Sequence, residues 1–192
     1  MSDTDPQTSP EHADSAGGNG EPQGREPWFR FALIFGVLAV ASELFYYAVA
    51  LDSDGFRSYL AVLAKISGAF LSVFNSEVAV NGTRILDSDF SIQVAQGCDA
   101  IQVCSLLAAA VIAFPVESLC KLRGLVLGIL LLQFLNLMRI VTLFWVGSYF
   151  PSVFKTAHEV VWPGILITIT VVIWVLWVRW ETQPPRSPEH AA

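Results

Sequence analysis

Long apolar runs separated by short polar segments dominate the middle of the chain. Residues 31–51 contain one charged side chain, Glu43. At about 1.5 Å of rise per residue, a helix of this length crosses the ~30 Å hydrocarbon core of a bilayer. Residues 100–116, 122–150 and 160–180 have the same apolar character. The pattern therefore predicts four transmembrane helices.

The first run has a second interpretation, as a secretory signal peptide. Ala48-Val49-Ala50 resembles the small-residue site at which such peptides are cleaved. The segment before the run is acidic, whereas a signal peptide begins with a basic segment, and the run is long for its apolar part. A transmembrane helix is therefore favoured.

Two segments between the first and second runs have other patterns. Residues 57–74 are apolar but include charged side chains, which predicts an amphipathic helix in the membrane interface, with a weak span as the alternative. Residues 78–80 and 83–86 flank Asn81-Gly82, a pair that favours a tight primed turn between two strands. Residues 90–94 alternate like a third strand. An open sheet edge is not tolerated in lipid, so we expect this hairpin element outside the membrane.

The basic side chains next to the four predicted spans share one side of the membrane: Arg25, Arg30, Lys121, Arg123, Arg179 and Arg186. The positive-inside rule makes that side cytoplasmic, so residues 52–99 and the connection at 150–158 are external. A fifth span at 57–74 would break this agreement. The expected fold is an all-α polytopic membrane protein with about four transmembrane helices, an interfacial helix and a small external β-hairpin.

Composition agrees with a membrane protein and disfavours other classes. Hydrophobic residues make up 54% of the chain and charged residues 15%, against about 25% charged residues in a soluble domain. The net charge of -6 disfavours nucleic-acid binding, because phosphate contacts need basic patches. Much of the acidity lies in residues 1–27. We predict disordered tails at 1–27 and 181–192, the second cytoplasmic, around a membrane-embedded domain at 28–180.

The few cysteines and histidines do not indicate a metal site. Cys98, Cys104 and Cys120 have neither a CxxC nor a zinc-ligand spacing. Of the three histidines, His158 alone lies between the predicted tails. No metal site is therefore expected.

Three reactive side chains are predicted to meet near the external membrane boundary. Along the predicted helices, Cys98 lies roughly 26 Å, Arg139 roughly 22 Å and His158 roughly 32 Å above the cytoplasmic end. Glu43 lies roughly 20 Å along the first helix, so we expect it to pair with Arg139, with a neutral carboxyl as the alternative.

Arg139 belongs to a polar stripe at three-residue spacing: Gln133, Asn136, Arg139 and Thr142. Residues three apart share one face of a helix, and an intramembrane arginine costs roughly 2.5–3.5 kcal/mol, so this face should point into the bundle. An arginine that extends to the interface as an anchor is the alternative.

Cys98 is a candidate nucleophile. Gly97 permits a sharp turn into the following helix, and a cysteine at a helix N-terminus has a lowered pKa that favours the thiolate. His158 titrates near neutrality and suits general acid–base catalysis. The alternatives are that Cys98 is a small packed residue and His158 a structural interface residue.

The order of these residues resembles the exosortase/archaeosortase family. The similar motifs are Gln96-Gly97-Cys98-Asp99-Ala100, Asn136-Leu137-Met138-Arg139-Ile140 and an external His158. The resemblance covers about residues 28–180, and residues 125–167 look most like exosortase H.

The resemblance implies a membrane cysteine transpeptidase without cofactors in the cytoplasmic (inner) membrane, with its active site facing the periplasm. Its substrates are exported proteins with a C-terminal signal composed of a short motif, a transmembrane helix and a basic cluster. In the H subgroup the motif is of the IPTLxxWG type. The family's catalytic cysteine, arginine and histidine correspond to Cys98, Arg139 and His158. We expect Asn136, Glu43 and Asp99 to support them.

One local feature departs from the family. The cysteine is often followed by a small or glycine-containing pair such as Ser-Gly, and here it is followed by Asp99-Ala100. An unpaired acid beside the nucleophile would oppose thiolate formation.

Two non-enzymatic interpretations are alternatives. In the first, the protein is a scaffold of an export system, and Arg139 and Glu43 serve only in helix packing. In the second, it is a small transporter or channel that uses the polar stripe as its pathway. The apolar residues 125–132 disfavour the transporter, because they offer no cytoplasmic opening.

Overall fold

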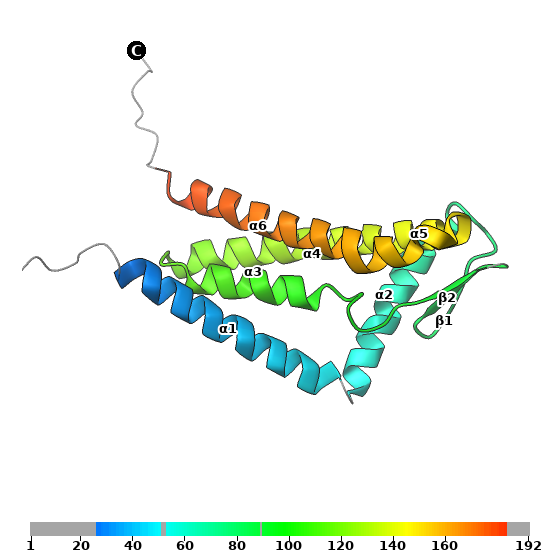
Figure 1. Cartoon of the computed structure of the whole chain (residues 1–192), viewed down its shortest axis with the longest axis horizontal. Coiled ribbons are helices and arrows are strands. Elements are labelled where there is room, and N and C mark those ends of the chain that lie inside the picture. The colour runs from blue at the N-terminus through cyan, green and yellow to red at the C-terminus, as the bar shows by residue number, and fades with distance from the viewer. Residues whose placement is uncertain (1–25, 51–52, 89, 184–192) are drawn as a thin grey trace, which may run out of the picture.

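Long helices lie side by side along the molecule, and one helix crosses their end (Figure 1). The computed structural model describes residues 26–50, 53–88 and 90–183. The bundle consists of α1 (Glu26–Ala50), α3 (Ile101–Ala113), α4 (Ser118–Tyr149) and α6 (Trp162–Glu181). The crossing helix is α2 (Asp54–Ser72).

The predicted fold class is confirmed, but one predicted span is shorter than expected. Three helices in the described part of the chain are long and apolar enough to cross a membrane: Trp28–Val49, Ser118–Tyr149 and Pro151–Glu181. The prediction of a full span at 100–116 is wrong, because α3 has 13 residues and a length of about 20 Å. Helix α3 ends at Ala113, and the backbone of the next residue, Phe114, is extended, as the following Pro115 favours.

The last helix starts earlier than the sequence indicates. Helix α5 (Pro151–Thr156) continues through a π-helical turn, η1 (Ala157–Val161), directly into α6. The segment at 150–158, predicted as an external connection, is therefore almost entirely helical. Single π-helical turns occur frequently at functional sites.

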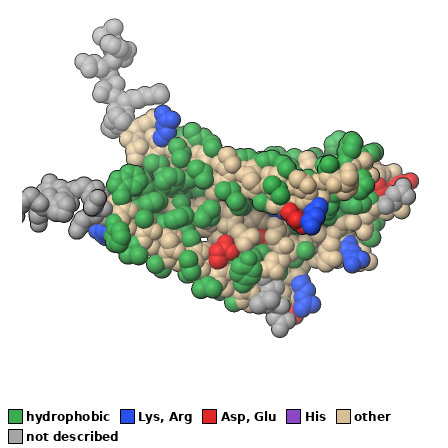
Figure 2. All heavy atoms as spheres, viewed as in Figure 1, with side chains coloured by type: hydrophobic (Ala, Val, Ile, Leu, Met, Phe, Trp, Pro, Cys, Tyr) green, Lys and Arg blue, Asp and Glu red, His purple; other side chains and the backbone are tan. Residues whose placement is uncertain are grey.

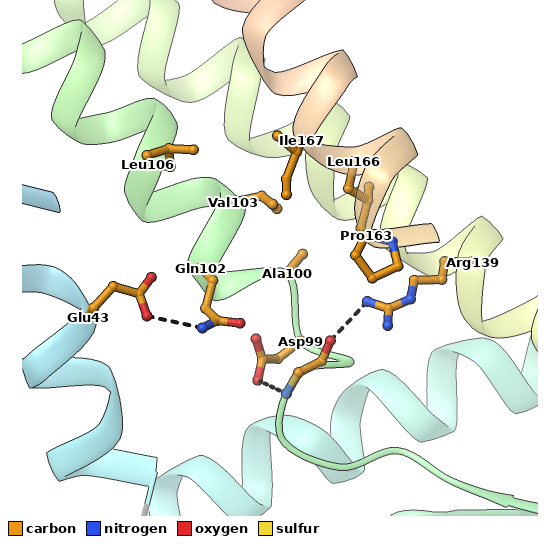
Figure 3. A pocket seen from close by; sticks show the side chains of 11 residues that line it. Glu43, Asp99, Ala100, Gln102, Val103, Leu106, Arg139, Pro163, Leu166 and Ile167 are labelled. Carbon is orange, nitrogen blue, oxygen red and sulfur yellow. Dashed lines mark hydrogen bonds between the residues drawn. The ribbon is translucent and has the colours of Figure 1, made fainter. Parts of the chain in front are cut away.

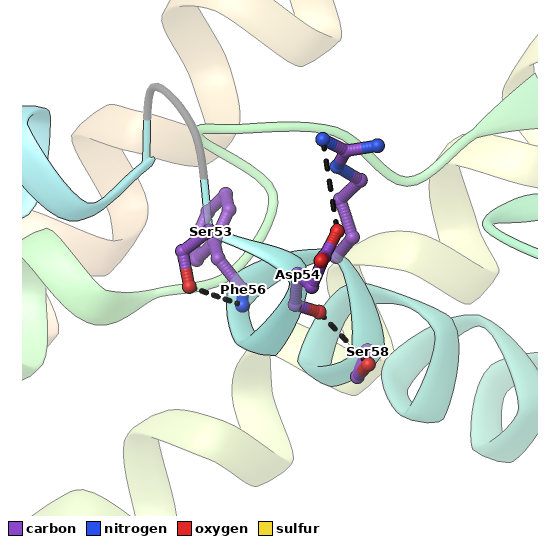
Figure 4. A network of polar contacts seen from close by, with 5 residues as sticks. Ser53, Asp54, Phe56 and Ser58 are labelled. Atoms are coloured by element: carbon purple, nitrogen blue, oxygen red, sulfur yellow. Dashed lines mark hydrogen bonds and ion pairs between the residues drawn. The ribbon is translucent and has the colours of Figure 1, made fainter.

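Helix α2 is amphipathic, as predicted for residues 57–74, and does not qualify as a candidate span. Ser53 caps its start, since the Ser53 side chain accepts a hydrogen bond of 3.3 Å from the Phe56 N–H (Figure 4). Its buried side chains form one face: Phe56, Leu60, Leu63, Ala64, Ser67, Gly68 and Leu71.

The predicted hairpin is present within a three-stranded antiparallel sheet. Strands β1 (Ala79–Asn81), β2 (Arg84–Leu86) and β3 (Ser91–Gln93) are adjacent in this order. Asn81 pairs with Arg84, so the turn residues are Gly82 and Thr83, one position later than predicted. Gly82 has a φ of 60°, which fits a primed turn with glycine at its first central position.

Helix α2, the sheet and the adjoining end of α4 share one hydrophobic core. Leu71, Ile85 and Phe144 are its largest fully buried side chains, and Cys98 belongs to the same cluster. Over the bundle, hydrophobic side chains cover most of the visible surface (Figure 2). This distribution suits helices that face lipid.

The predicted tails fall mostly outside the described residues. Helix α1 begins at Glu26, so the last two residues of the tail predicted at 1–27 are helical. Helix α6 ends at Glu181. Residues 1–25 and 184–192 lie outside the described part of the chain.

Candidate active site

Cys98 and His158 are in direct contact. Cys98 lies in the loop between β3 and α3, and His158 lies in the η1 turn. The Cys98 Sγ and His158 Nε2 atoms are 3.3 Å apart. The Cys98 side chain is buried, with 5% of its surface exposed. The predicted convergence of the thiol and the imidazole is thus present in the structure.

The polar stripe of α4 binds three consecutive carbonyl groups of the cysteine loop. Arg139 Nη1 donates to Gly97 O at 2.8 Å, and Asn136 Nδ2 donates to Cys98 O at 2.9 Å. Gln133 Nε2 donates to Asp99 O at 3.4 Å. The three-residue spacing on the helix therefore matches successive residues of the loop. These bonds satisfy backbone carbonyls of the loop, of which those of the buried residues Cys98 and Asp99 have little access to water.

Arg139 connects both halves of the cysteine–histidine pair. Besides Gly97 O, its guanidinium contacts His158 O, 3.4 Å from Nη2. The Arg139 side chain is 4% exposed, and its Nε has no hydrogen-bond partner in the described residues. Arg139 faces the bundle interior, as the sequence predicts, and does not extend to the interface as an anchor.

Two residues of the loop have left-handed backbone conformations. Gly97 has a φ of 87° and Ala100 a φ of 59°. This region is open to glycine but costs other residues roughly 1–2 kcal/mol. The strained Ala100 occupies the second position after the cysteine, where the family pattern quoted above has glycine.

The Asp99 carboxylate organises the loop. Oδ1 accepts the N–H of Ile101, the first residue of α3, at 2.8 Å. Oδ2 accepts the Tyr46 hydroxyl at 2.7 Å and the Gly97 N–H at 3.3 Å. Asp99 is 1% exposed, so these neutral donors replace the water that the carboxylate loses.

A further tyrosine supports the loop from α2. Tyr59 donates from its hydroxyl to Asp99 O at 2.9 Å and accepts from Gln133 Nε2 at 2.8 Å. Burial raises the pKa of Tyr59, so its hydroxyl stays protonated as a donor. Tyr46 and Tyr59 were not predicted as site residues, because a tyrosine in an apolar segment does not indicate which group its hydroxyl will bond.

The predicted lowering of the Cys98 pKa is wrong. Burial is the largest influence and raises the pKa of the Cys98 thiol, and the nearby Asp99 carboxylate raises it further. The positive charge of Arg139 and the hydrogen bond to the Ala95 backbone lower the pKa, but the effect of burial is larger than either. Ala100 is the N-cap residue of α3 and the first N–H of the helix bonds to Asp99 Oδ1, so the thiol does not occupy the helix-terminus position expected for it. The resting thiol is therefore protonated near neutrality.

The predicted contact between Glu43 and Arg139 is wrong. Glu43 Oε2 accepts a hydrogen bond of 3.0 Å from Gln102 Nε2, and Arg139 binds backbone carbonyls. Glu43 and Arg139 instead line opposite sides of one cavity of about 300 Å³ (Figure 3). Backbone carbonyls lie within hydrogen-bond distance of the Arg139 guanidinium, and the Glu43 carboxylate does not.

The other cysteines have no described hydrogen bond to His158, although Cys104 lies one turn after Ala100, whose O accepts the Cys104 N–H at 3.0 Å. Cys104 lies within α3 and Cys120 in the first turn of α4, and all three cysteines are free. Among the described residues, no group of three histidine, cysteine or acidic side chains is placed to hold a metal ion.

The fold and this site define a class: a multi-pass membrane protein with a partly buried cysteine–histidine pair that an arginine holds in place. A family model described as "Transmembrane exosortase (Exosortase_EpsH)" matches residues 20–178. The chain therefore belongs to the transmembrane exosortase family, whose members act as membrane transpeptidases in protein sorting. No curated protein and no solved structure matches the chain.

Proposed function

We propose that the protein is a membrane cysteine transpeptidase that cleaves the C-terminal sorting signal of exported proteins. We assign it to the exosortase H type, with signals of the IPTLxxWG kind, on the resemblance of residues 125–167. The observation that carries the enzymatic proposal is the 3.3 Å contact between Cys98 Sγ and His158 Nε2. A nucleophile within hydrogen-bond reach of a base is the signature of nucleophilic catalysis.

In the first half-reaction, His158 Nε2 accepts the thiol proton as Cys98 Sγ attacks the scissile carbonyl carbon. The tetrahedral intermediate collapses to a thioester, and the carbon–nitrogen bond breaks. His158 returns the proton to the leaving amine, which departs with the signal's transmembrane helix. In the second half-reaction, water or an amine attacks the thioester carbonyl while His158 accepts a proton from this nucleophile. The carbon–sulfur bond then breaks, His158 transfers that proton to the Cys98 sulfur, and the acid or amide product leaves.

Arg139 has two roles in this mechanism. Its hydrogen bonds to Gly97 O and His158 O fix the two backbones that carry the reacting side chains. Its buried positive charge stabilises the oxyanion of the tetrahedral intermediate. A lysine has no planar fork of donors and cannot bridge both carbonyls in the same way.

The proposed location is the cytoplasmic membrane, with the cysteine–histidine pair near its periplasmic face. Two observations support this orientation. The helices are apolar enough to face lipid, and basic side chains lie at the ends of α1 and α6 that are far from the cysteine–histidine pair. The transport alternative has less support, because the donors of the α4 stripe bind loop carbonyls.

An in-cell processing assay tests the proposal. The enzyme is co-expressed with a tagged reporter that carries an IPTLxxWG-type C-terminal signal. We expect Cys98→Ala to abolish cleavage and the matched variants Cys104→Ala and Cys120→Ala to retain it. Cleavage that persists in Cys98→Ala would remove the proposed nucleophile. Mass analysis of the new C-terminus separates water from an amine as the acceptor.

A further inference from the structure

A groove runs along the bundle between α1 and α6, with α3 as its floor. Helices α1 and α6 both pack on α3. The cavity of about 300 Å³ beside Arg139 and a second cavity of about 230 Å³ share Leu106 on α3. The α6 wall has the three- and four-residue spacing of one helix face: Pro163, Leu166, Ile167, Thr170, Val171 and Trp174.

The two ends of the groove differ in polarity. Far from the cysteine, the groove is apolar and is closed where Phe31 of α1 stacks on Trp174 of α6, with ring centroids 5.7 Å apart. At the other end, the wall contains Glu43, whose Oε2 binds Gln102, and Arg139, whose buried Nε is unpartnered among the described residues. Figure 3 shows Glu43 and Arg139 on opposite sides of this end.

We propose that this groove binds the transmembrane helix of the substrate and that Glu43 receives the N-terminal end of that helix. This inference rests on the proposed function. The apolar cavities suit the side chains of a membrane-spanning segment. The first four N–H groups of a helix lack partners within it, and its N-terminus carries a partial positive charge, so a carboxylate binds this end well.

The polar end of the groove lies next to the loop that carries the proposed nucleophile, Cys98. Gly97 and Asp99, the neighbours of Cys98, line its polar end. A helix that starts at Glu43 therefore delivers the residues before its first turn to the cysteine loop. A lipid acyl chain would fill the apolar part equally well but offers no N–H groups to the carboxylate. The polar end thus favours a peptide as the occupant.

Two substitutions within one turn of α6, on roughly opposite faces of the helix, test the groove. Ile167 is 50% exposed and lines it, whereas Ile165 is 39% exposed and is not among the groove residues. Ile167→Trp should reduce reporter processing by about tenfold or more, because the indole occupies substrate space, and Ile165→Trp should leave it near wild type. Glu43→Gln should reduce processing by about tenfold through the lost charge-assisted contact.

Readouts other than processing separate a blocked groove from a damaged enzyme. Alkylation of Cys98 by a small reagent should be unchanged in Ile167→Trp and Glu43→Gln. A photoreactive benzoylphenylalanine at position 167, in a Cys98→Ala background, should crosslink the reporter, whereas the same group at position 165 should not.

Crosslinking of position 167 to lipid alone, or normal processing in Ile167→Trp, would overturn the groove proposal. Normal processing in Glu43→Gln would overturn the role of Glu43. Neither result affects the proposed function, which fails only if Cys98→Ala still cleaves the reporter.

Discussion

At the scale of single residues, Cys98 is a thiol that needs a general base in order to react. Its burial raises its pKa, so few molecules carry a thiolate near neutral pH. His158 Nε2, 3.3 Å from the sulfur, is placed to remove the proton when the substrate arrives. The arrangement therefore favours general-base activation over a preformed thiolate.

The first prediction concerns the pH dependence of Cys98 alkylation. Arg139 lowers the pKa of Cys98 by its positive charge, although burial outweighs this effect. In a Cys104→Ala/Cys120→Ala background, the alkylation rate should rise with pH around a midpoint above that of an exposed cysteine. Arg139→Gln should move the midpoint to higher pH. A midpoint that stays in place or falls would contradict the assigned electrostatics.

The second prediction concerns the strained Ala100. Its φ of 59° suits glycine, and relief of the strain is partly offset by the greater freedom of glycine in the unfolded chain. Ala100→Gly should therefore raise the free energy of unfolding by about 0.5–1 kcal/mol and keep processing activity. Thermal unfolding in detergent measures the change. A loss of stability would show that the left-handed conformation is not the one that the loop adopts.

At the scale of elements, α4 acts as a scaffold for the cysteine loop. Its stripe binds the carbonyls of residues 97, 98 and 99 in order, which holds non-helical backbone inside the bundle. Non-helical backbone at membrane depth is tolerated only where protein or water satisfies it. The stripe therefore explains how a reactive loop is kept among apolar helices.

The third prediction tests this scaffold with two positions of the stripe. Asn136→Leu leaves Cys98 O without its donor and should cost about 1–3 kcal/mol of stability, with a marked loss of processing. The control is Thr142→Val, because the Thr142 hydroxyl bonds only to Arg139 O of its own helix among the described contacts. Its stability should change by less than about 0.5 kcal/mol. Equal effects of both substitutions in chemical denaturation would argue against the scaffold.

The fourth prediction concerns the π-helical turn. Deletion of Val160 would convert η1 to α-helix and shorten the spacing between His158 and Trp162, the first residue of α6, from four residues to three. We expect the deletion to abolish processing while the protein still inserts and folds, because the imidazole leaves Cys98. Val160→Ala retains the π-helical register and should stay active. An active deletion variant would contradict a need for the His158 orientation.

Most elements were predictable, and the exceptions have local causes. Apolar length and alternation predict α1, α2, α4 and the sheet. The π-helical turn has no sequence signal, and it joins α5 to α6 where the polar residues of 150–158 indicate a loop. Helix α3 is short because the Asp99 hydrogen bond to its first N–H and the Phe114-Pro115 sequence restrict it, features that hydropathy does not register.

At the scale of the whole molecule, depth along each helix was enough to bring Cys98, Arg139 and His158 together. The depth of a residue along a helix does not show in which direction its side chain points. It also does not show which of several nearby groups that side chain will bond. For this reason Glu43 was predicted to pair with Arg139, whereas Gln102 and the loop carbonyls are their actual partners. The contacts of Tyr46, which is buried, and of Tyr59, which is partly buried, with the cysteine loop were missed for the same reason.

The assembled molecule places one reactive site where its helical bundle meets α2 and the sheet. The fifth prediction, and the most direct test of the central claim, is detection of a covalent intermediate on Cys98. The purified protein is mixed in detergent with a peptide that contains the sorting signal, quenched in acid and mapped by mass spectrometry. We predict a thioester adduct on Cys98 that hydroxylamine removes and that is absent in His158→Ala. Peptide cleavage with no adduct on Cys98, or with an adduct on Cys104 or Cys120 instead, would contradict the account.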